Sequence, residues 1–230
     1  MKCSILIGFI FLFAITGNSQ VTVPLEQLPS HSDSLMNFLT KEYGRNKSIP
    51  VQYREQVLLT LSHFPELKDI KIKWRIKHQY TPLTTKPGFW SMFKQKNKRG
   101  YVITMSDKTI DTLTRLLYQN LTFEEQVGIM GHELSHVVDF RSKNLFQSAR
   151  NAIGHLSRHF IDRMEYHTDM ICVQHGLGNE LQAYSQHVRD VMHIHNWRGV
   201  DFVYDNNELH ERYMNPETIE KYKKEATLQR

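Results

Sequence analysis

The stretch Gly131–His136, "GHELSH", contains two histidines four positions apart, with Glu133 directly after the first. On a helix, residues i and i+4 lie one above the other, so His132 and His136 can present two ring nitrogens to one Zn²⁺. A catalytic zinc site takes three protein ligands and keeps a position for water. Glu133 would lie beside that water, where it can accept a proton and pass it to a leaving amine. The motif therefore predicts zinc-dependent hydrolysis of peptide bonds.

The chain is rich in histidine, with 13 in 230 residues, so two histidines that merely share a helix are the first alternative. Random placement gives roughly 0.04 matches to the motif in such a chain. The surrounding sequence also favours a helix, because Thr122 and Glu125 have the form of a capping box. Apolar residues then recur at helical spacing at Val127, Met130, Leu134, Val137 and Val138.

A third protein ligand has to come from elsewhere in the chain. Ser142 occupies the position of a third histidine six residues after the second, which excludes the class of site built that way. Glu165 and Asp169, in "EYHTD", are again i and i+4 on one expected helix. One can bind the metal while the other accepts the distal N–H of a ligand histidine and fixes its tautomer. His167 lies within the same stretch and is an alternative ligand.

At these residues the sequence resembles the gluzincin metallopeptidases, most nearly the CAAX-protease/HtpX-like family with its soluble periplasmic members. The resemblance covers about residues 100–180, through the stretches 121–140 and 165–169 and the strand "GYVITMS" before them. It implies Zn²⁺ held by His132, His136 and Glu165, Glu133 as catalytic base, and Asp169 hydrogen-bonded to a ligand histidine.

The resemblance also implies a zincin-like α+β fold, mainly helical, with a small sheet. The edge strand of that sheet, near Tyr101–Met105, would precede the active-site helix and pair with an extended polypeptide substrate. The His-Pro motif of many family members is absent as such, and Leu209–Pro216 is the closest stretch. His210 is therefore the predicted transition-state-stabilising residue, with Tyr184, His193 and His195 as alternatives.

The N-terminus has the features of a signal peptide. A lysine is followed by an apolar run from Ile5 to Ile15, which is too short to span a bilayer, and small residues favour cleavage after Ser19. An uncleaved anchor is the alternative. We expect a signal peptide at 1–19 and one metallopeptidase domain at 20–230, exported to the periplasm or secreted, without a stable membrane span. Cys172 is then the lone cysteine and is expected to be a buried small side chain.

The formal net charge is +5, and basic residues gather in Lys71–His78 and Lys94–Arg99. No nucleic-acid recognition motif accompanies them, so we predict no nucleic-acid partner and interpret both stretches as solvated surface. Binding to an anionic envelope surface is a weaker alternative.

Patterns along the chain favour helices, then a few strands, then helices, which predicts α+β architecture. Helices are expected at 32–44, 53–65 and 122–140, then one or two at 146–178 and one each at 180–197 and 214–225. Strands are expected at 69–80 and 99–107, and a turn-rich loop at 81–93 is expected to lead to another short extended piece. The combined prediction is an exported zinc-dependent endopeptidase. A zinc-binding scaffold or chaperone-like envelope protein with little turnover is the alternative from another class, and a helical protein without metal is the third. The sequence carries no signal for oligomeric state.

Overall fold

The computed structural model describes residues 33–88, 91, 94–95, 98–143, 157–194 and 211–228. The helices are α1 (Asp33–Tyr43), α2 (Arg54–Ser62), α3 (Phe123–Ser142), α5 (Arg158–Gln174), α6 (Gly178–Met192) and α7 (Pro216–Leu228). The strands are β1 (Lys47–Ser48), β2 (Lys71–Ile76), β3 (Leu83–Pro87) and β4 (Gly100–Met105), and the short 3-10 helices are η2 (Val51–Tyr53), η3 (Pro65–Leu67), η6 (Asp111–Leu116) and η7 (Tyr118–Asn120). This mostly helical arrangement with a small sheet confirms the predicted mixture of helices and strands. Among the described residues, no helix combines the length and apolar character needed to cross a bilayer.

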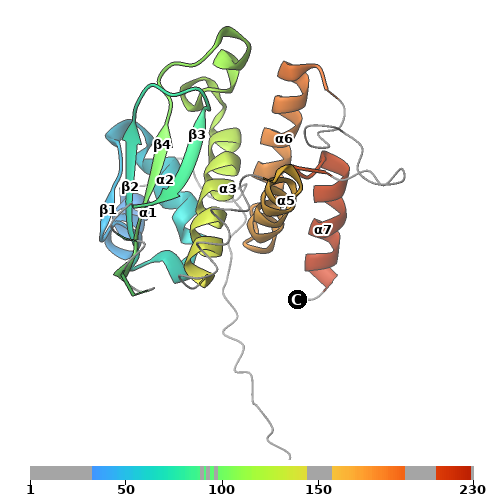
Figure 1. The fold of residues 1–230 in the computed structure, drawn as a ribbon. Helices are drawn as coiled ribbons and strands as arrows, with labels where there is room; N and C mark the ends of the chain where they lie inside the picture. Colours follow the sequence, from blue (N-terminus) through green and yellow to red (C-terminus); the bar gives the residue numbers. More distant parts are fainter. Residues whose placement is uncertain are drawn as a thin grey trace, which may run out of the picture.

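The four strands form one sheet in the order β1-β2-β4-β3. β1, β2 and β4 run parallel, whereas β3 runs antiparallel to β4. The prediction that the strand near Tyr101–Met105 forms the edge of the sheet is therefore wrong, because β4 lies between β2 and β3. The edge beside the long helix α3 is β3, which contacts α3 directly (Figure 1).

β3 itself lies in the segment predicted to be a turn-rich loop. Pro82 and Pro87 lie just before and at the end of this strand, and prolines usually indicate turns. Proline is nevertheless compatible with an edge strand, since the edge leaves some N–H positions unpaired. The threonines between the prolines are β-branched and favour extended backbone. The aromatic residues of that loop, Phe89, Trp90 and Phe93, lie outside the described residues.

α3 forms the centre of the molecule, between the sheet on one side and α5 and α6 on the other (Figure 1). It begins at the predicted capping box: the Thr122 hydroxyl accepts the Glu125 N–H at 3.3 Å, and the Glu125 carboxylate accepts the Thr122 N–H at 2.8 Å. The indole N–H of Trp74 donates to the Met130 sulfur at 3.2 Å, joining β2 to this helix. Burial of thirteen of its residues makes α3 a core helix, and its position is fixed from both sides.

Two glycines let α5 and α6 approach α3 closely. A Cβ on Gly128 would lie 2.1 Å from the Glu180 carbonyl oxygen, and one on Gly131 would lie 2.8 Å from the Cys172 sulfur. A side chain at Gly128 would have to displace the backbone of α6, and one at Gly131 would have to displace the side chains of Leu177 and Cys172. Cys172 is free and fully buried against this contact, as predicted. The close packing brings the acidic face of α5 to the histidines of α3.

Candidate metal centre

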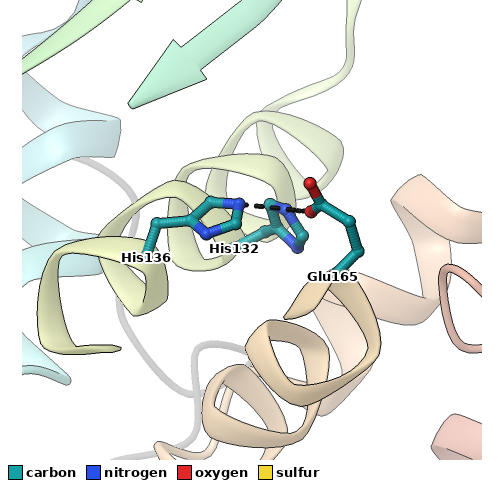
Figure 2. Close-up of side chains that lie close together, drawn as sticks. All are labelled: His132, His136 and Glu165. Atoms are coloured by element: carbon teal, nitrogen blue, oxygen red, sulfur yellow. Dashed lines mark hydrogen bonds and ion pairs between the residues drawn. The ribbon is translucent and has the colours of Figure 1, made fainter. Parts of the chain in front are cut away.

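Three side chains from two helices converge at one point between α3 and α5 (Figure 2). The Glu165 Oε2 atom lies 3.1 Å from His132 Nε2 and 3.2 Å from His136 Nε2. A zinc ion about 2.1 Å from each of three tetrahedral ligands requires ligand atoms about 3.4 Å apart. The two distances from Glu165 Oε2 are close to that value, and all three ligand atoms lie within 4.8 Å of one another. The sequence-predicted ligands His132, His136 and Glu165 are the three residues that come together here.

Asp169 orients the first of these histidines. Its Oδ1 atom lies 2.7 Å from His132 Nδ1, on the side of the ring away from Glu165. An ionised carboxylate can only accept, so Nδ1 carries the proton, and Nε2 is left to meet the shared point. The second oxygen of Asp169 accepts the backbone N–H of Met214 at 2.7 Å. Asp169 thus has the position that the sequence predicts, and it also connects the centre to residues after 210.

Thr168 orients the second histidine in the same way. Its hydroxyl donates to the Met164 carbonyl at 2.8 Å, so it must accept from His136 Nδ1, which lies 3.2 Å away. A hydroxyl has one hydrogen to give, which fixes the direction of the second bond. His136 therefore keeps its proton on Nδ1 and presents Nε2 toward Glu165. Sequence reasoning missed Thr168, although it stands between Glu165 and Asp169 in "EYHTD".

The electrostatics of the centre favour a bound cation. Burial lowers the pKa of the His132 imidazole, but hydrogen bonds to Asp169 and Glu165 outweigh it and raise that pKa well above its ordinary value. Burial raises the pKa of Glu165, but His136 and His132 outweigh it and hold the carboxyl ionised. Buried carboxylates that attract a proton to a ring nitrogen attract a divalent cation to the same position. We therefore expect protons and metal to compete for this site.

Glu133 lies on α3 beside the centre and does not belong to it. It is 5% exposed and lines the same cavity as His132, and its Oε2 atom has no hydrogen-bond partner among the described residues. The hydroxyl of Thr85, on the edge strand β3, donates to the Glu133 backbone carbonyl at 3.2 Å. A buried carboxylate oxygen without a partner is costly, and a water or ligand in the cavity would satisfy it.

A cavity of about 450 Å³ opens beside His132 and Glu133. It lies between β3, η6, α3 and α6. Its wall is mostly apolar, from Leu113, Leu116, Ile129, Leu181, Val188 and Met192. A small number of polar side chains next to the ligands and an apolar wall beyond them is the usual composition of a binding site for an organic ligand.

Tyr213 reaches the centre from the segment after residue 210. Its ring centroid lies 5.8 Å from that of His132, and its side chain lines the cavity. The buried guanidinium of Arg189 donates to the carbonyl of Met214 and to the Asn215 side chain, and the Ser185 hydroxyl donates to the same carbonyl at 2.9 Å. Together with Asp169, these bonds hold the backbone on the C-terminal side of Tyr213 against α5 and α6.

The predicted stabilising residue, His210, lies outside the described residues, as does His195. Tyr184 lines the cavity as one of the predicted alternatives, whereas His193 is exposed at the end of α6 and does not line it. His167 is exposed on α5 and takes no part in the cluster. Tyr213 lies within the stretch Leu209–Pro216 that sequence reasoning singled out, but that reasoning named His210 there and missed Tyr213.

Comparison of the chain with protein-family models, with curated proteins and with solved structures finds no match. The assignment of a function therefore depends on the chemistry of the centre itself.

Proposed function

We propose that this chain is an exported zinc-dependent endopeptidase of the gluzincin type, with a zincin-like fold. The observation that carries the proposal is the convergence of His132 Nε2, His136 Nε2 and Glu165 Oε2, with each ring turned by a hydrogen bond on its Nδ1 side. A structural histidine pair needs no such arrangement, because its second nitrogen would be satisfied by one acceptor of its own.

The residues around the centre divide the chemistry among them. Zn²⁺ bound by the three ligands supplies a Lewis acid that polarises a carbonyl and lowers the pKa of water. Glu133, next to the first ligand and with an unpartnered Oε2, accepts the proton of the attacking water and delivers it to the leaving amine. Burial raises the pKa of the Tyr213 and Tyr184 hydroxyls, so both remain protonated donors at neutral pH. In this proposal Tyr213, beside His132, donates to the oxyanion that forms from the substrate carbonyl.

The substrate is a polypeptide held in extended form. Among the described residues β3 pairs only with β4, so the backbone of its other edge is open to an added strand. Thr85 keeps this edge next to the backbone of Glu133. The apolar cavity beside Glu133 accepts a bulky apolar side chain next to the cleaved bond.

The test uses the purified chain, its zinc content and fluorogenic peptides with large apolar residues. We expect about one zinc per chain and cleavage that Glu133→Gln reduces by roughly 10² to 10⁴ in kcat/KM, because a general base is lost. The variant should keep its zinc and its thermal stability. Tyr213→Phe should reduce kcat more than it changes KM, because a donor to the oxyanion acts in the transition state.

Glu124→Gln is the matched control, since Glu124 is exposed in the first turn of the same helix. It should leave cleavage unchanged. A Glu133→Gln variant that cleaves as fast as the wild type would refute the mechanism. A zinc-loaded wild type that cleaves no peptide would instead favour the zinc-binding scaffold.

A further inference from the structure

The positive charge of this chain is concentrated in one part of the sequence. Residues 70–106 contain seven lysines and two arginines and no Asp or Glu, a formal charge of +9 in a chain whose total is +5. The rest of the chain therefore has a net charge of −4. This segment contains β2, β3 and β4, so the positive charge is concentrated on the sheet.

The register of the sheet places four of these cations on one face. Along β2, Lys71, Lys73 and Arg75 alternate with the buried Ile72 and Trp74, and all three are exposed. Lys73 aligns with Val102 of β4, which aligns with Lys86 of β3, so Lys86 is on the same face. Arg75 Nε donates to the Thr104 hydroxyl at 2.9 Å, which holds the guanidinium against this surface. We call Lys71, Lys73, Arg75 and Lys86 the basic face.

The basic face is uncompensated. Within the described ranges, no carboxylate lies within ion-pair distance of any of its four members. By contrast, exposed lysines elsewhere, such as Lys221 and Lys224 on α7, pair with neighbouring glutamates. The four cations cover about 13 Å along β2 and about 10 Å across to β3, from the rise and spacing of strands. Their mutual repulsion destabilises the fold slightly, and an anionic surface would relieve it.

We propose that the basic face docks this protein on the surface of an anionic lipid bilayer. Among the described strand residues the face carries lysines and no large exposed apolar side chain, and lysine is depleted in protein interfaces. The remaining positions of the described strands on this face are Ser48, Thr84, Gly100, Val102 and Thr104, so the strands themselves offer no aromatic side chain on which the bases of a single strand would stack. A layer of headgroup phosphates attracts a cluster of basic side chains through charge alone. The proposal does not depend on the metal centre.

Sedimentation of the full chain with vesicles tests the proposal. Vesicles of phosphatidylcholine with about one third phosphatidylglycerol should bind the protein, and added salt should weaken the binding. The triple variant Lys71→Gln, Lys73→Gln, Lys86→Gln should bind roughly 100-fold more weakly, because each lysine near such a surface contributes about a fivefold factor. Vesicles of phosphatidylcholine alone measure any binding by the apolar stretch 5–15, which all variants keep.

The matched control removes the same charge elsewhere, by Lys41→Gln, Lys221→Gln, Lys224→Gln, and should bind as the wild type does. Equal loss in both triple variants would show that net charge alone attracts the protein, and would overturn the proposal. So would the absence of binding to phosphatidylglycerol vesicles. Tighter binding of a DNA or RNA oligonucleotide, lost in the first triple variant alone, would assign the face to nucleic acid instead. Unchanged circular dichroism and thermal midpoint confirm that each variant is folded.

Discussion

Two clusters of histidine and glutamate lie at different positions along α5, and they differ in how their polar atoms are partnered. The first is the candidate metal centre, where His132 and His136 share the single oxygen Glu165 Oε2. The second joins the ends of α2 and α5. There His175 donates from Nδ1 to the Ile171 carbonyl and from Nε2 to Glu66, at 2.7 and 2.8 Å.

In the second cluster, both ring nitrogens of His175 and the Nδ1 atom of His63 each have a separate acceptor. His63 Nδ1 lies 2.9 Å from the His175 carbonyl oxygen, and the His175 ring stacks on Phe64 with centroids 4.3 Å apart. No ring nitrogen shares an acceptor with another ring. The contrast shows that a histidine-carboxylate contact by itself does not indicate a metal. What distinguishes the first cluster is that two rings, each anchored through Nδ1, direct Nε2 to one point.

Removing the glutamate of each cluster should give the largest difference between them. Glu165→Ala should weaken zinc binding by more than about 100-fold, since loss of a ligand has a larger effect than loss of a residue that only hydrogen-bonds to a ligand. Glu66→Ala, the matched change, should leave zinc content unchanged. Metal analysis after dialysis against a competing chelator measures both. Equal zinc content in the two variants would refute the metal centre, and the circular dichroism of each establishes that it is folded.

Thr168 gives a finer test of how the first cluster is built. Thr168→Val keeps the shape of the side chain and removes the hydroxyl that accepts from His136 Nδ1. We expect zinc affinity to fall by roughly 10- to 100-fold, because the ring loses the bond that sets its tautomer and orientation. Thr168→Ser should restore most of the affinity, as it returns the hydroxyl. If the Thr168→Val and Thr168→Ser variants bind zinc with equal affinity, the Thr168 hydroxyl does not orient His136.

The parts of the site that the sequence predicted are those with a local signal. The capping box at Thr122, the four-residue spacing of His132 and His136, and the spacing of Glu165 and Asp169 all follow from the geometry of single helices. The order of the strands is set by contacts between distant segments, so the edge of the sheet was assigned to β4 in place of β3. Pro82 and Pro87 added to the error, because they resemble the ends of a loop.

The missed residues depend on the tertiary structure in the same way. Thr168 is informative only when His136 of another helix lies beside it. Tyr213 belongs to the centre because Asp169 and Arg189 bind the backbone next to it, across 45 and 25 residues of sequence. Neither contact leaves a periodic or spaced pattern in the chain. The sequence therefore predicted the three residues that converge and Asp169 beside them, but not Thr168 or Tyr213.

The smallest effect that we expect is a pH dependence of stability caused by the second cluster, through His175 and Glu66. Burial lowers the pKa of His175, but the hydrogen bond to Glu66 outweighs it and raises that pKa above the ordinary 6.5. For Glu66, burial raises the pKa, but His175 outweighs it and lowers that pKa below the ordinary 4.5. Because folding raises the pKa of His175, its contribution to stability is fully present below about pH 6.5. That contribution is lost as the pH rises through the folded pKa. Because folding lowers the pKa of Glu66, its contribution to stability is present above about pH 4.5. That contribution is lost as the pH falls through the folded pKa.

The pair therefore contributes most between these two values. Glu66→Gln keeps an acceptor for His175 and removes the charge, so it should lower the free energy of unfolding by about 1 kcal/mol near pH 5.5. The difference between variant and wild type should shrink from pH 5.5 toward pH 9, because His175 loses its charge as the pH rises through its folded pKa. Urea denaturation at both pH values measures it, and His175→Gln should show the same trend. If the difference in the free energy of unfolding grows with pH, His175 is not the proton-binding partner of Glu66. The two clusters would then differ only in their geometry.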